Sequence, residues 1–106
     1  MKNIYGKIRG EDLPLLESVV QIFKKRGLKG GLHGTSLWNR NYKDVDLLVV
    51  SGSSASGVES FLMALDDLKN KHSAKILKEK GNELIGLDYE VEIGKMILHL
   101  SYVVLL

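Results

Sequence analysis

The stretch GTSLWNRNYKDVDLLVVS, residues 34–51, decides the fold predicted for this chain. It opens with a turn of small residues and carries two aspartates, Asp44 and Asp46, just before the apolar run LLVV. Such a run predicts a buried strand over residues 43–50. Side chains alternate along a strand, so Asp44 and Asp46 are expected to project together from one face, about 7 Å apart.

Two neighbouring carboxylates indicate a cation site. Like charges at short range repel each other, and the arrangement is costly unless a cation lies between them. Hard oxygen ligands suit Mg²⁺, which keeps water and phosphate oxygens in its other coordination positions. Gly34, Thr35 and Ser36 are predicted to form the phosphate-binding part of such a site. Glycine lets the backbone approach an anion closely, and hydroxyl and N–H groups can then bind it. The alternative is a solvated acid pair that follows an ordinary turn.

Taken in this order, the two motifs resemble a known signature. Residues 33–36 (HGTS) followed by residues 43–50 (KDVDLLVV) resemble the DNA polymerase beta-like nucleotidyltransferase superfamily, especially its small stand-alone domains and antibiotic-modifying members. The resemblance implies that Asp44 and Asp46 bind a divalent metal carrying a nucleoside triphosphate, and that the preceding turn holds its phosphates. The sequence departs from the pattern after the turn, where LWNR replaces the usual Ala-Arg-Gly and Arg40 is the candidate basic group.

Length and composition limit the class of protein. The 106 residues are predicted to form one domain, residues 1–106, with a modest core. A net charge of +2 argues against a dedicated duplex-DNA surface but suits a polyanionic small substrate. The absence of cysteine excludes disulfides and zinc–thiolate sites. No signal peptide or membrane-spanning run is found, so a cytoplasmic protein with no membrane partner is expected.

The remaining sequence gives the order helix, strand, strand, helix, then two or three strands. Asp12 is predicted to cap a helix that runs to Lys25, and Ser56 to start a second helix that ends near Asn70. The other predicted strands are residues 30–33, 74–78, 84–93 and 96–104. This order predicts an α+β fold, a mixed β-sheet of four to five strands with two main helices packed on one face.

A two-residue turn at Gly94-Lys95 would fix the register of the last two strands. The facing pairs would be Glu92 with Ile97, Glu90 with His99, and Asp88 with Ser101, all on one sheet face. The resemblance implies a third acid near His99, where histidine is a departure. Glu90, directly across, is predicted as the third metal ligand, while His99 could act as base or ligand. The alternative is that the acids of this strand only decorate an exposed face.

The resemblance implies a nucleotidyltransferase that passes a nucleoside monophosphate from a nucleoside triphosphate, bound with one or two Mg²⁺ ions, to an acceptor hydroxyl. Arg40 or Lys43 would offset charge on the departing pyrophosphate, and Glu90 with or without His99 would assist deprotonation. The acceptor is left open, and a helical partner protein or a homo-oligomer is the expected source of acceptor-binding surface. The alternative is a catalytically degenerate module of the same fold that binds a nucleotide or a partner protein.

Overall fold

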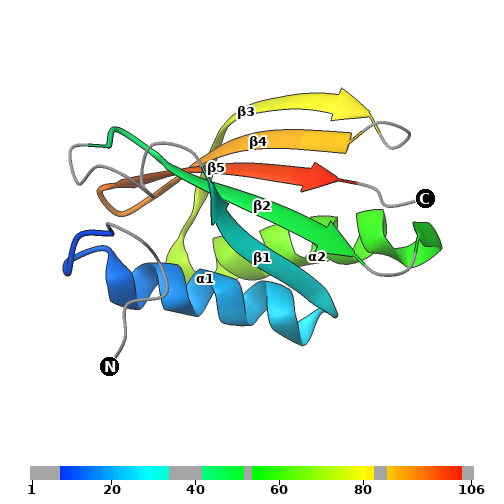
Figure 1. Cartoon of the computed structure of the whole chain (residues 1–106), viewed down its shortest axis with the longest axis horizontal. Coiled ribbons are helices and arrows are strands. Elements are labelled where there is room, and N and C mark those ends of the chain that lie inside the picture. Colours follow the sequence, from blue (N-terminus) through cyan, green and yellow to red (C-terminus); the bar gives the residue numbers. More distant parts are fainter. Residues whose placement is uncertain (1–7, 34–41, 52–53, 83–85, 104–106) are drawn as a thin grey trace.

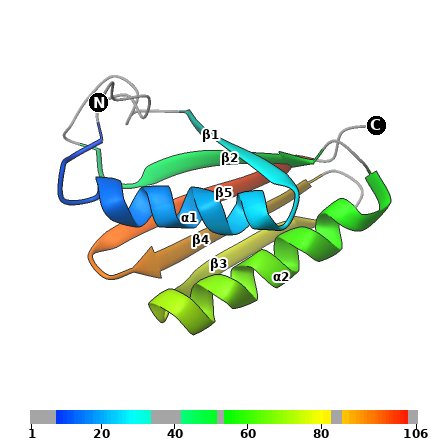
Figure 2. The same ribbon diagram turned by 90° about the horizontal axis from the view of Figure 1, so that it is seen from below.

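The computed structural model describes residues 8–33, 42–51, 54–82 and 86–103. Its elements are α1 (Leu13–Lys25), β1 (Leu28–His33), β2 (Val45–Ser51), α2 (Ser54–His72), β3 (Lys75–Asn82), β4 (Gly86–Ile93) and β5 (Met96–Val103). They form two layers, a five-stranded sheet and a pair of helices along one of its faces (Figure 1 and Figure 2). The predicted α+β class, with a mixed sheet and two helices on one face, is confirmed.

The sheet has the strand order β1-β2-β5-β4-β3. Neighbouring strands are antiparallel except for β2 and β5, which are parallel. A parallel pair requires a long connection, which α2, β3 and β4 provide. Strand β2 begins at Val45 rather than at the predicted Lys43, and β1 begins at Leu28 rather than at Gly30. The strand predicted at residues 74–78 is the longer β3.

The β4–β5 hairpin has the register predicted from its turn. Gly94 and Lys95 form a two-residue loop between Ile93 and Met96, and Gly94 has a φ of 59°. A glycine with positive φ at the first loop position suits a type II′ turn, whose twist matches that of the strands. The paired residues are Glu92 with Ile97, Glu90 with His99, and Asp88 with Ser101, as predicted.

Helix α1 spans the predicted residues, whereas its capping contact and the start of α2 differ from the prediction. Asp12 occupies the N-cap position of α1, yet its side chain makes no capping hydrogen bond. Its carboxylate instead accepts a hydrogen bond of 2.6 Å from the Tyr42 hydroxyl, a partner that no local pattern indicates. Helix α2 begins at Ser54 rather than Ser56 and extends to His72. No helix in the described part of the chain is long and apolar enough to cross a membrane.

The core lies between the helices and the sheet, with Phe61 of α2 at its centre. Its ring stacks on Phe23 of α1 and on Tyr102 of β5, with ring centroids 5.8 and 5.0 Å apart. Gly57 lets α2 lie close to the sheet, because a Cβ there would overlap the Tyr102 hydroxyl oxygen and come within 2.5 Å of Ser51 Oγ. The opposite face of the sheet carries neither helix (Figure 1 and Figure 2).

Candidate functional site

Parallel pairing of β2 with β5 brings Asp46 beside His99. The two residues are partners in the ladder although they are 53 positions apart in sequence. Their strand neighbours Val45, Leu47 and Leu98 are fully buried in the core. Because side chains alternate, Asp46 and His99 both face the side that the helices leave uncovered. Asp46 Oδ1 lies 3.0 Å from His99 Nδ1.

The imidazole of His99 also contacts a second carboxylate. His99 Nε2 lies 2.9 Å from Asp88 Oδ1, and Ser101 Oγ donates a hydrogen bond of 2.9 Å to the same oxygen. The exposed fraction of the side chain is 19% for Asp46, 37% for His99 and 48% for Asp88. The side chains of Asp46, His99, Asp88 and Ser101 therefore form a hydrogen-bonded row across β2, β5 and β4, and its partial exposure leaves it accessible to a ligand. We call it the acid–histidine row.

The charge pattern of the acid–histidine row determines the state of its histidine. Ionised carboxylates only accept hydrogen bonds, so a carboxylate at each ring nitrogen favours the imidazole form that carries a proton on both. Burial acts to lower the pKa of His99, but the hydrogen bonds and charges of Asp46 and Asp88 outweigh it, and the net pKa is raised above the ordinary 6.5. The imidazole of His99 thus lies between the carboxylates of Asp46 and Asp88, and both carboxylates favour its protonated form.

The structure brings Asp46 and His99 of the predicted site residues into contact and places Asp44 and Glu90 differently from the expectation. Asp46 and His99 meet as described. Asp44 lies in a bend one residue before β2 and is partly buried, so strand alternation does not place it beside Asp46. Glu90 faces His99 in the ladder, but the carboxylate that reaches the imidazole is Asp88.

Asp88 is the site residue that sequence reasoning missed. The predicted register already puts Asp88 and Ser101 on the correct face, but it does not distinguish a directly opposed contact from a diagonal one. A diagonal neighbour two residues along the partner strand remains within reach of a long or aromatic side chain. His99 uses that diagonal contact, which is set by side-chain rotamers and sheet twist rather than by the hairpin register.

Of the residues predicted to bind phosphate, Lys43 lies two residues before β2. Lys43 is exposed and borders a cavity of about 420 Å³ between the start of α1 and the β4–β5 turn. Gly34, Thr35, Ser36 and Arg40 lie outside the described residues.

The predicted metal ligands near β2, Asp44 and Asp46, are carboxylates, whose oxygens are hard ligands. Among the residues that the structure describes, no three histidine, aspartate or glutamate side chains are grouped so as to hold a metal ion. Mg²⁺ is usually held by only one or two carboxylates, with substrate phosphates and water completing its coordination. A site built on Asp44 and Asp46 would therefore need phosphate and water oxygens to complete the coordination of the ion.

Comparison with known proteins identifies the fold. By sequence, no family model and no curated protein match the chain. By structure, the chain matches Cid1, an enzyme with RNA terminal uridylyl transferase activity, with a TM-score of 0.69, 14% identity, and coverage of 91% of this chain and 32% of that one. A cytoplasmic RNA terminal U-transferase matches with a TM-score of 0.65, 14% identity, and coverage of 91% and 30%.

The fold is nucleotidyltransferase-like. The likeness to these structures confirms the nucleotidyltransferase-like fold that the resemblance of the HGTS and KDVDLLVV motifs implies. The chain spans about a third of the length of each of these two structures. At 14% identity the likeness concerns the fold and does not extend to activity.

Proposed function

We propose that the chain is a nucleotidyltransferase that moves a nucleoside monophosphate from a Mg²⁺-bound nucleoside triphosphate to an acceptor hydroxyl. The observation that carries the proposal is the position of Asp46 within this fold. It lies on the uncovered face at the start of β2, a strand paired on both sides, and a histidine orients its carboxylate.

In this proposal, Asp44 and Asp46 hold one or two Mg²⁺ ions together with the triphosphate. The bound metal supplies charge neutralisation at the phosphates. The acceptor oxygen attacks the α-phosphorus, the bond from that phosphorus to the bridging oxygen breaks, and pyrophosphate leaves. Lys43 offsets part of the charge on the pyrophosphate, with Arg40 as the second candidate, and residues 34–36 bind phosphate oxygens.

His99 and Glu90 take different roles in the proposal. Both nitrogens of His99 are engaged with carboxylates, so it has no free lone pair with which to accept a proton. Its role is to orient Asp46 from the side away from the metal, as outer partners of metal ligands do. Glu90 makes no hydrogen bond or ion pair with the other described residues, so its carboxylate is available as a base or as the third metal ligand.

The acceptor and partners follow from similarity. The two structural relatives are named for terminal uridylyl transfer to RNA, so UTP and an RNA 3′-hydroxyl are the first donor and acceptor to test alongside ATP. Residues 1–106 are taken as one catalytic domain that acts in the cytoplasm. A helical partner protein or a second copy would supply the remaining acceptor-binding surface.

A second function, a nucleotide-binding module without catalysis, is favoured by one observation. His99 stands where the resemblance implies a third acid, and it is neutralised by two carboxylates rather than being free to bind metal. Such a module would bind a nucleotide at Asp44 and Asp46 but would not turn it over.

Calorimetry with each nucleoside triphosphate, with and without Mg²⁺, tests the proposal. Binding should depend on Mg²⁺ and be lost in Asp44→Asn/Asp46→Asn. Pyrophosphate release with an RNA oligonucleotide or other candidate acceptors should follow, and should fall sharply in Glu90→Gln. Tight binding without release in any of these reactions favours the module. Binding that is indifferent to the double aspartate substitution rules out both functions.

A further inference from the structure

A dense set of contacts joins the start of α1 to the residue that leads into β2. The backbone N–H of Arg9 donates to the Tyr42 hydroxyl oxygen at 3.0 Å, and that hydroxyl donates to Asp12 Oδ2 at 2.6 Å. The Arg9 guanidinium donates to the Tyr42 carbonyl oxygen at 3.0 Å and lies 4.0 Å from the centre of its ring. We call these three residues the Tyr42 clamp.

A further contact joins the two charged residues of the clamp. Arg9 Nε also donates to Asp12 at 3.4 Å, so the two charged side chains bracket the phenol. The Tyr42 hydroxyl accepts a hydrogen bond from the Arg9 backbone and donates one to Asp12, so its position is fixed from two sides. Tyr42 is only 4% exposed, so the clamp holds a buried anchor rather than a surface side chain.

The position of this anchor relates it to the candidate metal site. Tyr42 is two residues before Asp44, and Val45, one residue after Asp44, is fully buried and paired with Leu98 of β5. Asp44 is therefore held between two fixed points, one made by the clamp and one by the sheet. Asp46, in contrast, is fixed by the sheet and by His99 alone.

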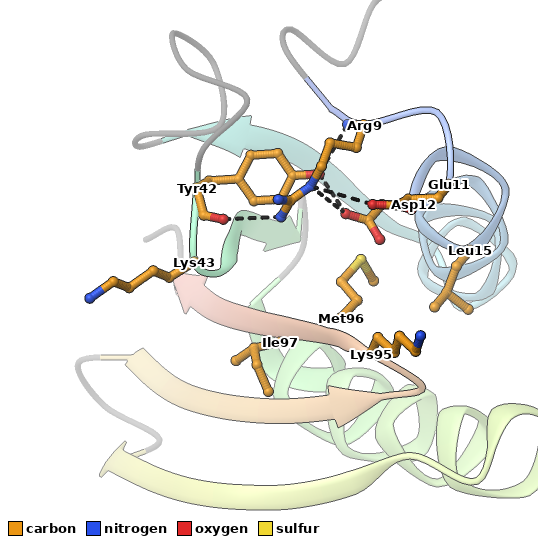
Figure 3. A pocket seen from close by; sticks show the side chains of 9 residues that line it. All are labelled: Arg9, Glu11, Asp12, Leu15, Tyr42, Lys43, Lys95, Met96 and Ile97. Atoms are coloured by element: carbon orange, nitrogen blue, oxygen red, sulfur yellow. Dashed lines mark hydrogen bonds and ion pairs between the residues drawn. The ribbon is translucent and has the colours of Figure 1, made fainter.

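The clamp also forms one wall of the cavity of about 420 Å³ that Lys43 borders. Figure 3 shows the Arg9 and Asp12 side chains converging on Tyr42, while Lys43 extends from the adjoining backbone. The apolar side chains of Met96 and Leu15 lie next to them. The clamp thus fixes the backbone that leads into β2, and it also shapes the adjoining cavity.

We propose that Arg9 and Asp12 are positioning residues that act through Tyr42 to hold Asp44 in place for the metal–nucleotide complex. The inference rests on the proposed function and gives a role to three residues that touch neither metal nor nucleotide. Loss of the clamp frees Asp44 while leaving Asp46 in place. Removing a residue that hydrogen-bonds to a metal ligand and orients it typically weakens metal affinity by about 10-fold or more.

Tyr42→Phe tests the clamp, because it removes the hydroxyl and both of its hydrogen bonds but keeps the ring under Arg9. The first readout needs no ligand: backbone amide exchange of residues 43–45 should accelerate, while exchange of residues 47–49 stays unchanged. The second is the calorimetric affinity for Mg²⁺ with nucleoside triphosphate, which should fall about 10-fold. Asp12→Asn, which keeps an acceptor for the hydroxyl, should produce a smaller loss.

Arg26→Ala is the matched control. Arg26 forms an arginine–aspartate pair away from the site, with two hydrogen bonds to Asp67 at 2.8 and 3.0 Å that join the end of α1 to α2. Its loss should leave exchange at residues 43–45 and nucleotide affinity unchanged. An equal affinity loss in Arg26→Ala and Tyr42→Phe would overturn the inference, because it would show general destabilisation.

The two proposals fail in different ways. Unchanged exchange at residues 43–45 in Tyr42→Phe overturns the clamp, whatever the protein binds. Faster exchange with unchanged nucleotide affinity also overturns it, because Asp44 would then be free without consequence. Absence of nucleotide binding by the unmodified protein overturns the proposed function and, with it, the link between clamp and site.

Discussion

Replacing Gly57 by alanine measures how closely α2 lies on the sheet. In an exposed helix the change would stabilise the protein by about 0.5–1 kcal/mol, because glycine loses more backbone entropy on folding. Here the new Cβ would overlap the Tyr102 hydroxyl oxygen and approach Ser51 Oγ to 2.5 Å, well inside the ordinary contact distance of 3.4–4 Å. The variant is therefore less stable if the steric overlap costs more free energy than the higher helix propensity of alanine contributes.

The size of the effect follows from these contacts. Overpacking a core costs about 1–3 kcal/mol, and the upper value applies because two side chains must move. After subtraction of the propensity gain, the free energy of unfolding should fall by about 2 kcal/mol. For a chain of this length, that corresponds to a drop of roughly 10 °C in Tm.

Thermal and urea unfolding of the variant check this value. Glu59→Ala, at an exposed position of the same helix, is the control and should leave stability nearly unchanged. Gly57→Ala/Tyr102→Phe removes the overlapping oxygen and should recover part of the loss. The Tyr102 hydroxyl is buried without a hydrogen-bond partner among the described residues, so removing it costs little. A Gly57→Ala protein as stable as the unmodified chain would refute the close packing of α2.

Three further perturbations test the electrostatics. Asp46→Asn should lower the pKa of His99, followed by NMR titration of its ring protons, and an unmoved pKa would contradict the contact. Because the pKa of folded His99 is raised, its stabilising contribution is complete below the unfolded value of about 6.5 and is lost as pH rises through the folded pKa. The stability difference between the unmodified protein and His99→Gln should therefore shrink as the pH rises above about 6.5, and a difference that stays constant would argue against the raised pKa of His99. The hydrogen bond from Arg26 lowers the pKa of Asp67, so its contribution is present above the unfolded value of about 3.8 and is lost as pH falls through the folded pKa. Asp67→Asn should thus reduce stability at neutral pH, less so in acid or high salt, and an equal loss at all pH values would exclude the ion pair as its cause.

Local rules predict much of this fold from the sequence. Two-residue alternation puts Asp46 on the polar side of β2 and Val45 and Leu47 in the core, as observed. The Gly94-Lys95 turn fixes the β4–β5 register because a two-residue loop admits few geometries. These features depend only on residues that are close along the chain.

Contacts between distant segments account for what the sequence does not predict. Asp12 has the residue type of a helix cap, but a buried phenol thirty positions away is its actual partner. Asp88 rather than Glu90 reaches His99 because of a diagonal contact, which pairing alone does not specify. Asp44 lies before β2 because the strand pairing ends there, a boundary set by the neighbouring strands rather than by β-propensity.

Anomalous diffraction from crystals grown with Mn²⁺ and a non-hydrolysable nucleoside triphosphate tests the central claim most directly. The proposal predicts a manganese peak within about 2.0–2.6 Å of carboxylate oxygens of both Asp44 and Asp46, with triphosphate oxygens in the same coordination shell and His99 still bonded to Asp46. A metal and nucleotide bound elsewhere on the molecule, or a peak that touches neither aspartate, would contradict the claim.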